Sequence, residues 1–226
     1  MFQSVPETYD ILNRLLTLSL DRTWRARAAS ECLKNNPARI LDLCCGTGDL
    51  AINIAEQAEY AAEITGLDYS RNMLDIARRK AGRLRGRKIN FICADAADTP
   101  LPDSYFDTIG ISFSFRNLTF RNKNSGIFLK EVRRMLKSGG RLVIIETSQP
   151  PAEIVRKICH LYFKCFAAPV GGFLSGRYRA YRYLAWSAVN YFDNDEAVSF
   201  LKDHGFKNVE SRPCLFGAVS LYTAEK

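Results

Sequence analysis

Residues that could hold a small-molecule ligand follow the first apolar run of this sequence. Gly46, Thr47 and Gly48 stand directly after "RILDLCC" (39–45), and glycine there lets the backbone turn tightly and lets a ligand approach closely. An acidic residue, Asp68, lies 20 residues beyond Gly48 at the end of the next apolar run, where a carboxylate can bind a ribose. This succession of strand, turn, helix, strand and acid predicts a nucleotide-binding site.

The charges around the turn indicate which nucleotide it binds. The segment "GTGDLA" (46–51) satisfies the dinucleotide pattern G-x-G-x-x-A, so an NAD-dependent oxidoreductase stays open as an alternative. Asp42 precedes the turn, however, and Asp49 follows it. Two carboxylates repel a pyrophosphate and attract a sulfonium that carries an ammonium group, so these charges favour S-adenosylmethionine.

Residues after the third and fourth apolar runs complete the predicted pocket. Asp95 in "CADAAD" (93–98) can accept a hydrogen bond from an adenine amino group while Ala96 leaves room for the ring, although Asp95 is also typical of a helix cap. Arg116 and Asn117 follow the fourth run, at the expected mouth of the pocket. Arg116 there would stabilise a developing oxyanion or orient a water that takes a proton. The alternative is a surface arginine beside a helix-capping asparagine.

The cysteines predict neither a redox centre nor a metal site. The chain holds seven cysteines, but none is paired as C-x-x-C, and the two histidines, His160 and His204, are far apart. Cys44 and Cys45 are adjacent on a strand, so their side chains face opposite sides and are poorly placed to form one pair. We expect reduced thiols that are mostly buried, and no bound metal.

Strand and helix patterns alternate along most of the chain. The expected helices cover 49–61, 70–84, 124–136 and 194–206, and the expected strands cover 39–45, 63–70, 89–96, 106–115, 141–148, 207–214 and 218–226, the last two as a hairpin. The segment "KSGG" (137–140) is expected to close the third of these helices. Repeated strand–helix units predict an α/β fold with a mostly parallel seven-stranded sheet, helices on both faces and an antiparallel strand at the C-terminal end. In such a fold the ligand lies beyond the carboxyl ends of the strands.

Length and composition predict a single domain over 1–226. The 226 residues are 47% hydrophobic, enough for one full core. A helical segment over 1–37 and an aromatic, basic insert over 149–192 interrupt the alternation, and both could cover the strand ends as a lid. No run of about 18 apolar residues occurs and the first residues lack the pattern of a secretion signal, so we expect a cytoplasmic protein without a membrane span.

Basic residues are concentrated in two segments of this chain, whose net charge is +8. The first, 71–88, is interpreted as a solvated helix face, although such clusters can also attract phosphates or nucleic acid. In the second, 153–182, one predicted helical face carries Ile154, Ile158, Leu161, Tyr162 and Cys165. That face fits an amphipathic helix lying on an anionic membrane surface, and it fits equally a lid helix packed on the sheet.

Several motifs resemble the menaquinone/ubiquinone biosynthesis C-methyltransferase family, within the class I S-adenosylmethionine methyltransferases. They extend over nearly the whole chain: "YDILN", "LDLCCGTGD", "GLDYSRNML", "ISFSFRN", "EVRRMLKSGGRLVIIETSQP", "PVGG" and "YRYLAWS". The resemblance implies a Rossmann-like methyltransferase fold, and donor binding by Thr47, Asp68, Asp95, Ala96 and Ser112. The full set of donor-site candidates adds Asp42, Gly46, Gly48, Tyr69 and Met73.

The resemblance also implies the reaction. The expected substrate is a reduced polyprenyl quinone precursor, demethylmenaquinol, whose ring carbon attacks the sulfonium methyl group while the protein supplies proximity and orientation. Arg116 and Asn117 are the candidate catalytic residues, and Tyr9 could reach in from the N-terminal lid, unless it is simply a half-buried aromatic residue. A ubiquinone-pathway benzoquinol or another small aromatic acceptor stays open, as do a homodimer and a peripheral contact with the inner face of the membrane. An RNA methyltransferase is a weaker alternative, and we expect no nucleic-acid partner.

Overall fold

A computed structural model describes residues 10–84 and 86–226, together with the backbone of Tyr9. Its strands are β1 (Arg39–Leu43), β2 (Glu63–Asp68), β3 (Ile89–Cys93), β4 (Phe106–Ser112), β5 (Leu136–Thr147), β6 (Lys207–Cys214) and β7 (Val219–Glu225). Its α-helices are α1 (Tyr9–Leu16), α2 (Leu20–Cys32), α3 (Asp49–Gln57), α4 (Arg71–Ala81), α5 (Phe115–Thr119), α6 (Ser125–Met135), α7 (Glu153–Tyr162), α8 (Ala168–Ser175), α9 (Tyr178–Val189) and α10 (Asn194–Asp203). A π-helical turn, Phe163–Ala167, joins α7 to α8, and a 3₁₀ turn, Leu215–Gly217, joins β6 to β7.

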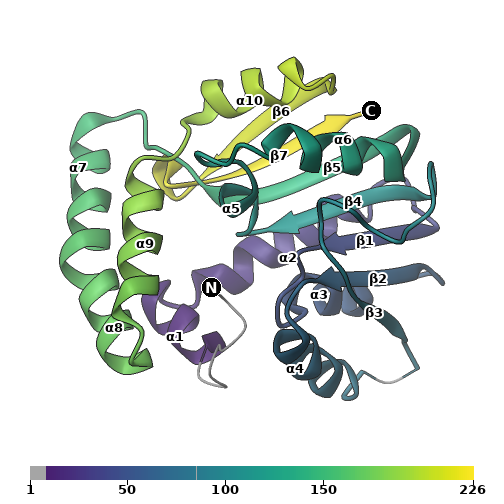
Figure 1. The fold of residues 1–226 in the computed structure, drawn as a ribbon, viewed down its shortest axis with the longest axis horizontal. Coiled ribbons are helices and arrows are strands. Elements are labelled where there is room, and N and C mark those ends of the chain that lie inside the picture. The colour runs from purple at the N-terminus through teal and green to yellow at the C-terminus, as the bar shows by residue number, and fades with distance from the viewer. Residues whose placement is uncertain (1–8, 85) are drawn as a thin grey trace.

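One seven-stranded sheet forms the centre of the molecule, with the strand order β3-β2-β1-β4-β5-β7-β6 (Figure 1). The five strands β1 to β5 pair in parallel, and β7 is antiparallel to both of its neighbours, β5 and β6. The predicted sheet and its C-terminal hairpin are therefore confirmed. The strand order reverses at β1, between β2 and β4, which places the ligand-binding crevice beyond the carboxyl ends of β1 and β4.

Two hydrophobic layers sandwich this sheet. Neighbouring residues of β1 separate between them: Ile40 packs with α2 and α3 on one face, and Leu41 packs with α6 and α10 on the other. Val143 and Ile144 of β5 divide in the same way. Both faces of the central strands are thus buried, which is why these strands read as continuous apolar runs rather than as an alternating pattern.

Most expected elements are shorter in the structure by a few residues at an end, and two boundaries differ for an identifiable physical reason. The fourth strand ends at Ser112 rather than at residue 115, because Phe113 adopts a left-handed backbone (φ 54°) and Phe115 begins the short helix α5. The strand expected from 141 begins at Leu136, directly after α6. Its "KSGG" segment is taken up by the sheet, where the register shifts between Phe106 and Thr108 of β4 and Gly139 is left-handed.

Helices outside the sheet lie near the strand ends that carry the crevice. Figure 1 shows α7, α8 and α9 as a separate layer beside the sheet, with α1 next to α8. A hydrogen bond from the Tyr162 hydroxyl group to the carbonyl oxygen of Leu16 joins α7 to α1. The two segments that the sequence set apart, 1–37 and 149–192, therefore meet in space.

Candidate active site

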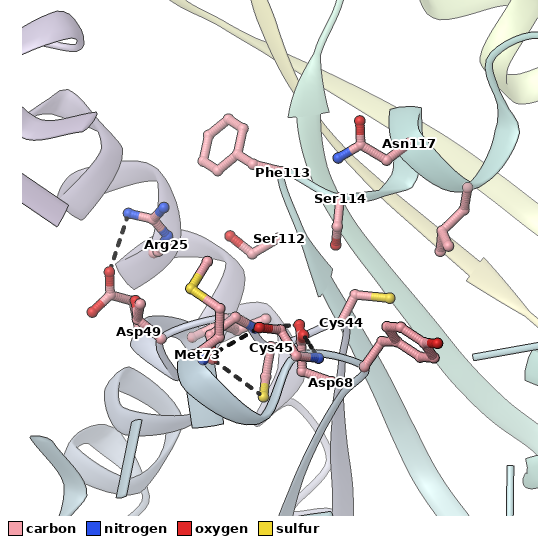
Figure 2. A pocket seen from close by; sticks show the side chains of 16 residues that line it. Arg25, Cys44, Cys45, Asp49, Asp68, Met73, Ser112, Phe113, Ser114 and Asn117 are labelled. Atoms are coloured by element: carbon pink, nitrogen blue, oxygen red, sulfur yellow. Dashed lines mark hydrogen bonds and ion pairs between the residues drawn. The ribbon is translucent and has the colours of Figure 1, made fainter. Parts of the chain in front are cut away.

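A cavity of about 390 Å³ opens at the carboxyl ends of β1, β2 and β4 (Figure 2). The turn from β1 to α3, the turn from β2 to α4, and the segment from β4 into α5 all contribute to its walls. Of the predicted donor-site residues, the cavity is lined by Gly46, Thr47, Asp68, Tyr69, Met73 and Ser112. Of the predicted catalytic residues, Asn117 lines it.

The glycine turn has the geometry that its composition predicts. Gly46 (φ +53°) and Gly48 (φ +79°) both occupy the left-handed region, which side chains rarely tolerate. A Cβ atom on Gly48 would lie 2.9 Å from the Cβ of Ala77, so α3 can approach α4 only because this position is glycine. Gly48 itself lies beneath the cavity rather than in its wall, and its role is to shape the turn.

Asp68 holds the two turns together. Its Oδ2 accepts a hydrogen bond from the backbone N–H of Gly46 at 2.8 Å, and its Oδ1 accepts one from the N–H of Ser70, also at 2.8 Å. Burial raises the pKa of Asp68, against the lowering effect of these backbone N–H groups. Each oxygen keeps a further lone pair, so the carboxylate can still accept hydrogen bonds from a ribose lying in the cavity.

Asp42 does not reach the cavity, contrary to the expectation that it acts there as a charge. Its side chain is fully buried below the turn, where Oδ2 accepts a hydrogen bond from the N–H of Ala51 at 2.9 Å and Oδ1 has no partner. Burial raises the pKa of Asp42 to about 8. The carboxyl group is therefore mostly protonated at neutral pH, so the charge argument drawn from this residue fails. The alternation of side chains along the strand did not reveal that Asp42 is buried.

Asp95 and Ala96 lie beside the main cavity. Asp95 lines an adjoining cavity of about 460 Å³ that shares Tyr69 and Ser70 with the first. Its Oδ1 accepts a hydrogen bond from the N–H of Ala97 at 2.9 Å, as in an Asx turn. Ala96 is buried and lines neither cavity.

Two hydroxyl groups in the wall lack partners. The Oγ atoms of Ser112 and Ser114 are buried from solvent and hold no hydrogen bond within the described part of the chain. Buried polar groups are almost always paired, so these hydroxyls indicate that a polar ligand completes the site. With Asp68 and the cradle at Gly46, they fit a nucleoside that carries further hydrogen-bonding groups.

Arg116 is not at the mouth of the pocket, where the sequence placed it. It is 5% exposed, its Nη1 donates to Thr147 Oγ1 at 2.7 Å, and it lies 3.9 Å from Glu146 Oε1. The cause is Glu146, which is fully buried at the end of β5 and requires a nearby cation. Glu146 Oε2 also accepts a hydrogen bond from the backbone N–H of Arg116 at 3.0 Å, so it caps α5 and thereby fixes Asn117 in the cavity wall.

A charged cluster ties α1 to the glycine turn. Thr47 Oγ1 donates to Asp10 Oδ1 at 2.8 Å, and Lys80 Nζ donates to Asp10 Oδ2 at 2.8 Å and to Thr47 Oγ1 at 3.2 Å. Lys80 also pairs with Asp49. The hydroxyl proton of Thr47 is thus already committed to Asp10, the residue that follows Tyr9. The side chain of Tyr9 lies outside the described residues.

The adjacent cysteines line the cavity as uncharged side chains. All seven cysteines are free thiols. Burial raises the pKa of both Cys44 and Cys45 far above the ordinary value, and the nearby carboxylates, Asp42 and Asp68, add to the effect. Neither thiol ionises near neutral pH, in agreement with the packing role expected from the sequence.

Sequence reasoning missed several residues of this cavity, among them Arg25, Phe113 and Leu118. Arg25 lies on α2, whose place next to the glycine turn only the tertiary structure reveals. One local signal was available: Asp21 and Arg25 are spaced i, i+4 on the predicted helix and form an ion pair.

Curated relatives match the chain from end to end. A demethylmenaquinone methyltransferase of Thermotoga maritima is 39% identical over 226 residues, covering 100% of this chain and 94% of the relative. The protein of the same name from Thermus thermophilus is 39% identical, covering 100% of both chains. The ubiquinone/menaquinone biosynthesis C-methyltransferase UbiE of Geotalea daltonii is 36% identical over 228 residues, covering 100% of this chain and 94% of the relative.

Solved structures match the fold at low sequence identity. A SAM-dependent methyltransferase from Aquifex aeolicus superposes with a TM-score of 0.65 at 18% identity, covering 96% of this chain and 97% of that one. An S-adenosylmethionine-dependent methyltransferase from Clostridium acetobutylicum gives a TM-score of 0.65 at 16% identity, covering 96% of both chains. The predicted methyltransferase fold is thereby confirmed, and with the family match so is the predicted methyl donor, S-adenosylmethionine. The profile of the ubiE/COQ5 methyltransferase family matches residues 1–226, and the chain belongs to that family.

Proposed function

We propose that this enzyme transfers the methyl group of S-adenosylmethionine to a ring carbon of a reduced polyprenyl quinone precursor, with demethylmenaquinol as the preferred acceptor. One observation carries the proposal: a single cavity joins the nucleotide turn and Asp68 to the β4–α5 segment, where Phe113 and Leu118 offer apolar surface beside Asn117. Relatives named for demethylmenaquinone methylation cover the full chain and support the choice of acceptor.

The donor supplies an electrophilic methyl group on a sulfonium, and the residues of this chain orient it. We propose that Asp68 binds the ribose hydroxyl groups and that Tyr69 and Met73 flank the nucleoside. Asp95, in the adjoining cavity, would receive the adenine amino group, and the free hydroxyl of Ser112 would complete the polar contacts. Holding both reactants in line provides most of the rate enhancement in such a reaction.

On the acceptor side, we propose that Asn117 holds the quinol oxygen next to the attacking carbon, because its side chain lines the cavity. Arg116 acts as a positioning residue: its backbone N–H donates to Glu146 and its guanidinium donates to Thr147, so it fixes α5 against the end of β5. Tyr9, from the N-terminal lid, remains the third candidate for contact with the acceptor ring.

Methyl transfer to purified acceptors tests the proposal. The enzyme is incubated with isotopically labelled S-adenosylmethionine and either reduced demethylmenaquinone or a reduced ubiquinone-pathway benzoquinol, and the quinones are analysed by mass spectrometry. We expect the naphthoquinol to gain one methyl group, and Asn117→Ala to slow this step while leaving donor affinity unchanged. Labelling of the benzoquinol alone would favour the second acceptor. Labelling of RNA instead, or a nicotinamide absorbance change without methyl transfer, would reject the function.

We further propose that the acceptor is taken up at the inner surface of the cytoplasmic membrane. The helical stretch Glu153–Ser175 is long and apolar enough to cross a membrane by length and composition, which the count of uninterrupted apolar residues did not reveal. Its residues Ile154, Leu161 and Phe173 are 75%, 62% and 86% exposed, and Arg156 and Lys157 accompany them. Such a helix suits an anionic lipid surface, which sedimentation with phosphatidylglycerol vesicles would detect and neutral vesicles would control.

A further inference from the structure

Arg25 is the basic side chain that lines the donor cavity, and none of the other described lining residues carries a positive charge. It comes from the middle of α2, and 12% of its side chain is exposed. Figure 2 shows Arg25 beside Asp49 at one side of the cavity, with Cys44 and Asn117 at the other side. A nearly buried guanidinium is costly unless its charge and its N–H donors find partners, so the partners of Arg25 decide what it can still bind.

The contacts of Arg25 fix its guanidinium without using all of its donors. Its Nη1 bonds to Asp21 on the same helix and lies 3.7 Å from Asp49 Oδ2. The guanidinium carbon lies 5.3 Å from the centre of the Phe113 ring, which also lines the cavity. Nε and Nη2 hold no hydrogen bond with the described residues, so a planar pair of donors is left for a ligand.

The orientation of the donor follows from residues already placed. The ribose is assigned to Asp68, and the adenine to the side of Tyr69 and Asp95, in the adjoining cavity. The methionine end of the donor must then extend from Asp68 along the glycine turn, toward Asp49 and Arg25. That end carries a carboxylate and an ammonium group, and this part of the wall offers one guanidinium and one carboxylate.

We propose that Arg25 binds the carboxylate of the methionine moiety of S-adenosylmethionine and that Asp49 faces its ammonium group. This inference rests on the donor geometry proposed above and is independent of the acceptor. The surrounding charges agree with this assignment. The cluster contains three carboxylates and two cations, so its net charge is one negative: Asp10, Asp21 and Asp49 with Arg25 and Lys80. A zwitterionic tail next to a sulfonium carries one positive charge overall and would balance it.

Binding measurements with two ligands test the assignment directly. Isothermal titration calorimetry compares S-adenosylmethionine with its decarboxylated analogue, which lacks only the carboxylate. We expect the wild-type enzyme to bind the complete donor more tightly by about tenfold or more, as for a charge-assisted hydrogen-bonded pair. In Arg25→Gln this preference should fall to within about threefold of equality, because the complete donor loses affinity and the analogue does not.

Controls separate the role of Arg25 from a general loss of structure. Arg22→Gln changes an exposed arginine on the same helix that lines a neighbouring cavity, and it should keep the wild-type preference. Because the preference is a ratio measured within one protein sample, partial unfolding cancels from it. If Arg25→Gln does not fold, Arg25→Lys takes its place in the test. This variant keeps a cation opposite Asp21 but loses the planar pair of donors, so it should also show a reduced preference for the complete donor.

The outcomes are distinct. The preference is the ratio of the dissociation constant of the decarboxylated analogue to that of S-adenosylmethionine. A ratio near one in the wild-type enzyme, or a wild-type ratio retained by both Arg25→Gln and Arg25→Lys, would overturn the assignment while leaving the methyltransferase function intact. Absence of donor binding by the wild-type enzyme would overturn the assignment and the proposed function together. Failure of quinol methylation with normal donor binding would affect the acceptor alone.

Discussion

Replacement of the buried Asp42 by asparagine should change how the stability of the protein depends on pH. Asp42 Oδ2 accepts a hydrogen bond from Ala51, and Oδ1 has no partner. Asparagine can keep the accepted bond through its carbonyl oxygen, but it cannot ionise. The wild-type carboxyl group, in contrast, has a pKa raised to about 8 by burial in the folded protein and one of about 4 in the unfolded chain.

The sign and size of the effect follow from these two pKa values. Between them the folded state binds the proton more tightly than the unfolded state does, so the free energy of unfolding falls as pH rises. The slope is about 1.4 kcal/mol per pH unit up to the folded pKa, and it vanishes above it. Between pH 6 and pH 9 the wild-type protein should therefore lose about 3 kcal/mol relative to Asp42→Asn.

Urea denaturation of both proteins across this pH range, followed by circular dichroism, measures the difference. Taking the difference removes the contribution of every other titrating group that the two proteins share. Asp107→Asn is the matched control. Partial burial opposes ionisation of Asp107, but hydrogen bonds from Lys137 and from the Arg39 backbone hold its pKa low. The change in the free energy of unfolding caused by Asp107→Asn should therefore not vary over this pH range. A difference for Asp42→Asn that stays constant from pH 6 to pH 9 would refute the reasoning, since it would mean that the carboxylate is ionised throughout.

Three further substitutions have defined outcomes. Gly48→Ala should lower the free energy of unfolding by about 2 kcal/mol and with it the melting temperature, because the new methyl group meets α4 and the left-handed backbone is strained. An unchanged melting temperature would contradict the described turn. Arg116→Ala should lower the free energy of unfolding by about 3 kcal/mol in urea denaturation, because the buried carboxylate of Glu146 loses its cation. Adding Glu146→Gln removes that uncompensated charge and should restore most of the lost stability. Near-normal turnover of Arg116→Ala with unchanged donor affinity would reject a role for Arg116 in the reaction. Lys80→Met should increase protease cleavage near α1 and weaken donor binding in calorimetry, because Asp10 loses its cation; equal cleavage rates in both proteins would argue against the contact.

The sequence predicted the fold because its signals are local. Apolar runs, the glycine turn and the N-cap at Ser70, whose hydroxyl accepts a hydrogen bond from the N–H of Met73, depend on residues close together in the chain. The boundary at Ser112 was missed for the opposite reason. Helix α5 lacks a capping side chain of its own and is capped by Glu146, which is distant in sequence.

The same distinction explains the candidate site. Gly46, Asp68 and Asn117 were found because each lies at the carboxyl end of a strand or shortly after it, which the pattern of the chain reveals. The burial of Asp42 was not predictable in this way, because β1 is covered on both faces and alternation carries no information there. Arg116 is buried through its contacts with Glu146, which is distant in sequence. Arg25 was missed because its distance to the cavity is a property of helix packing.

The two backbone hydrogen bonds to Asp68 have a consequence for the thermodynamics of binding. They join the turn after β1 to the turn after β2 through a side chain, so the two turns are cross-linked before any ligand arrives. Little conformational entropy is then lost from these turns on binding, and the cavity can hold a flexible ligand without ordering its own walls. Asp68 would therefore serve affinity twice, as the proposed contact to the ligand and as the cross-link between the two turns around it.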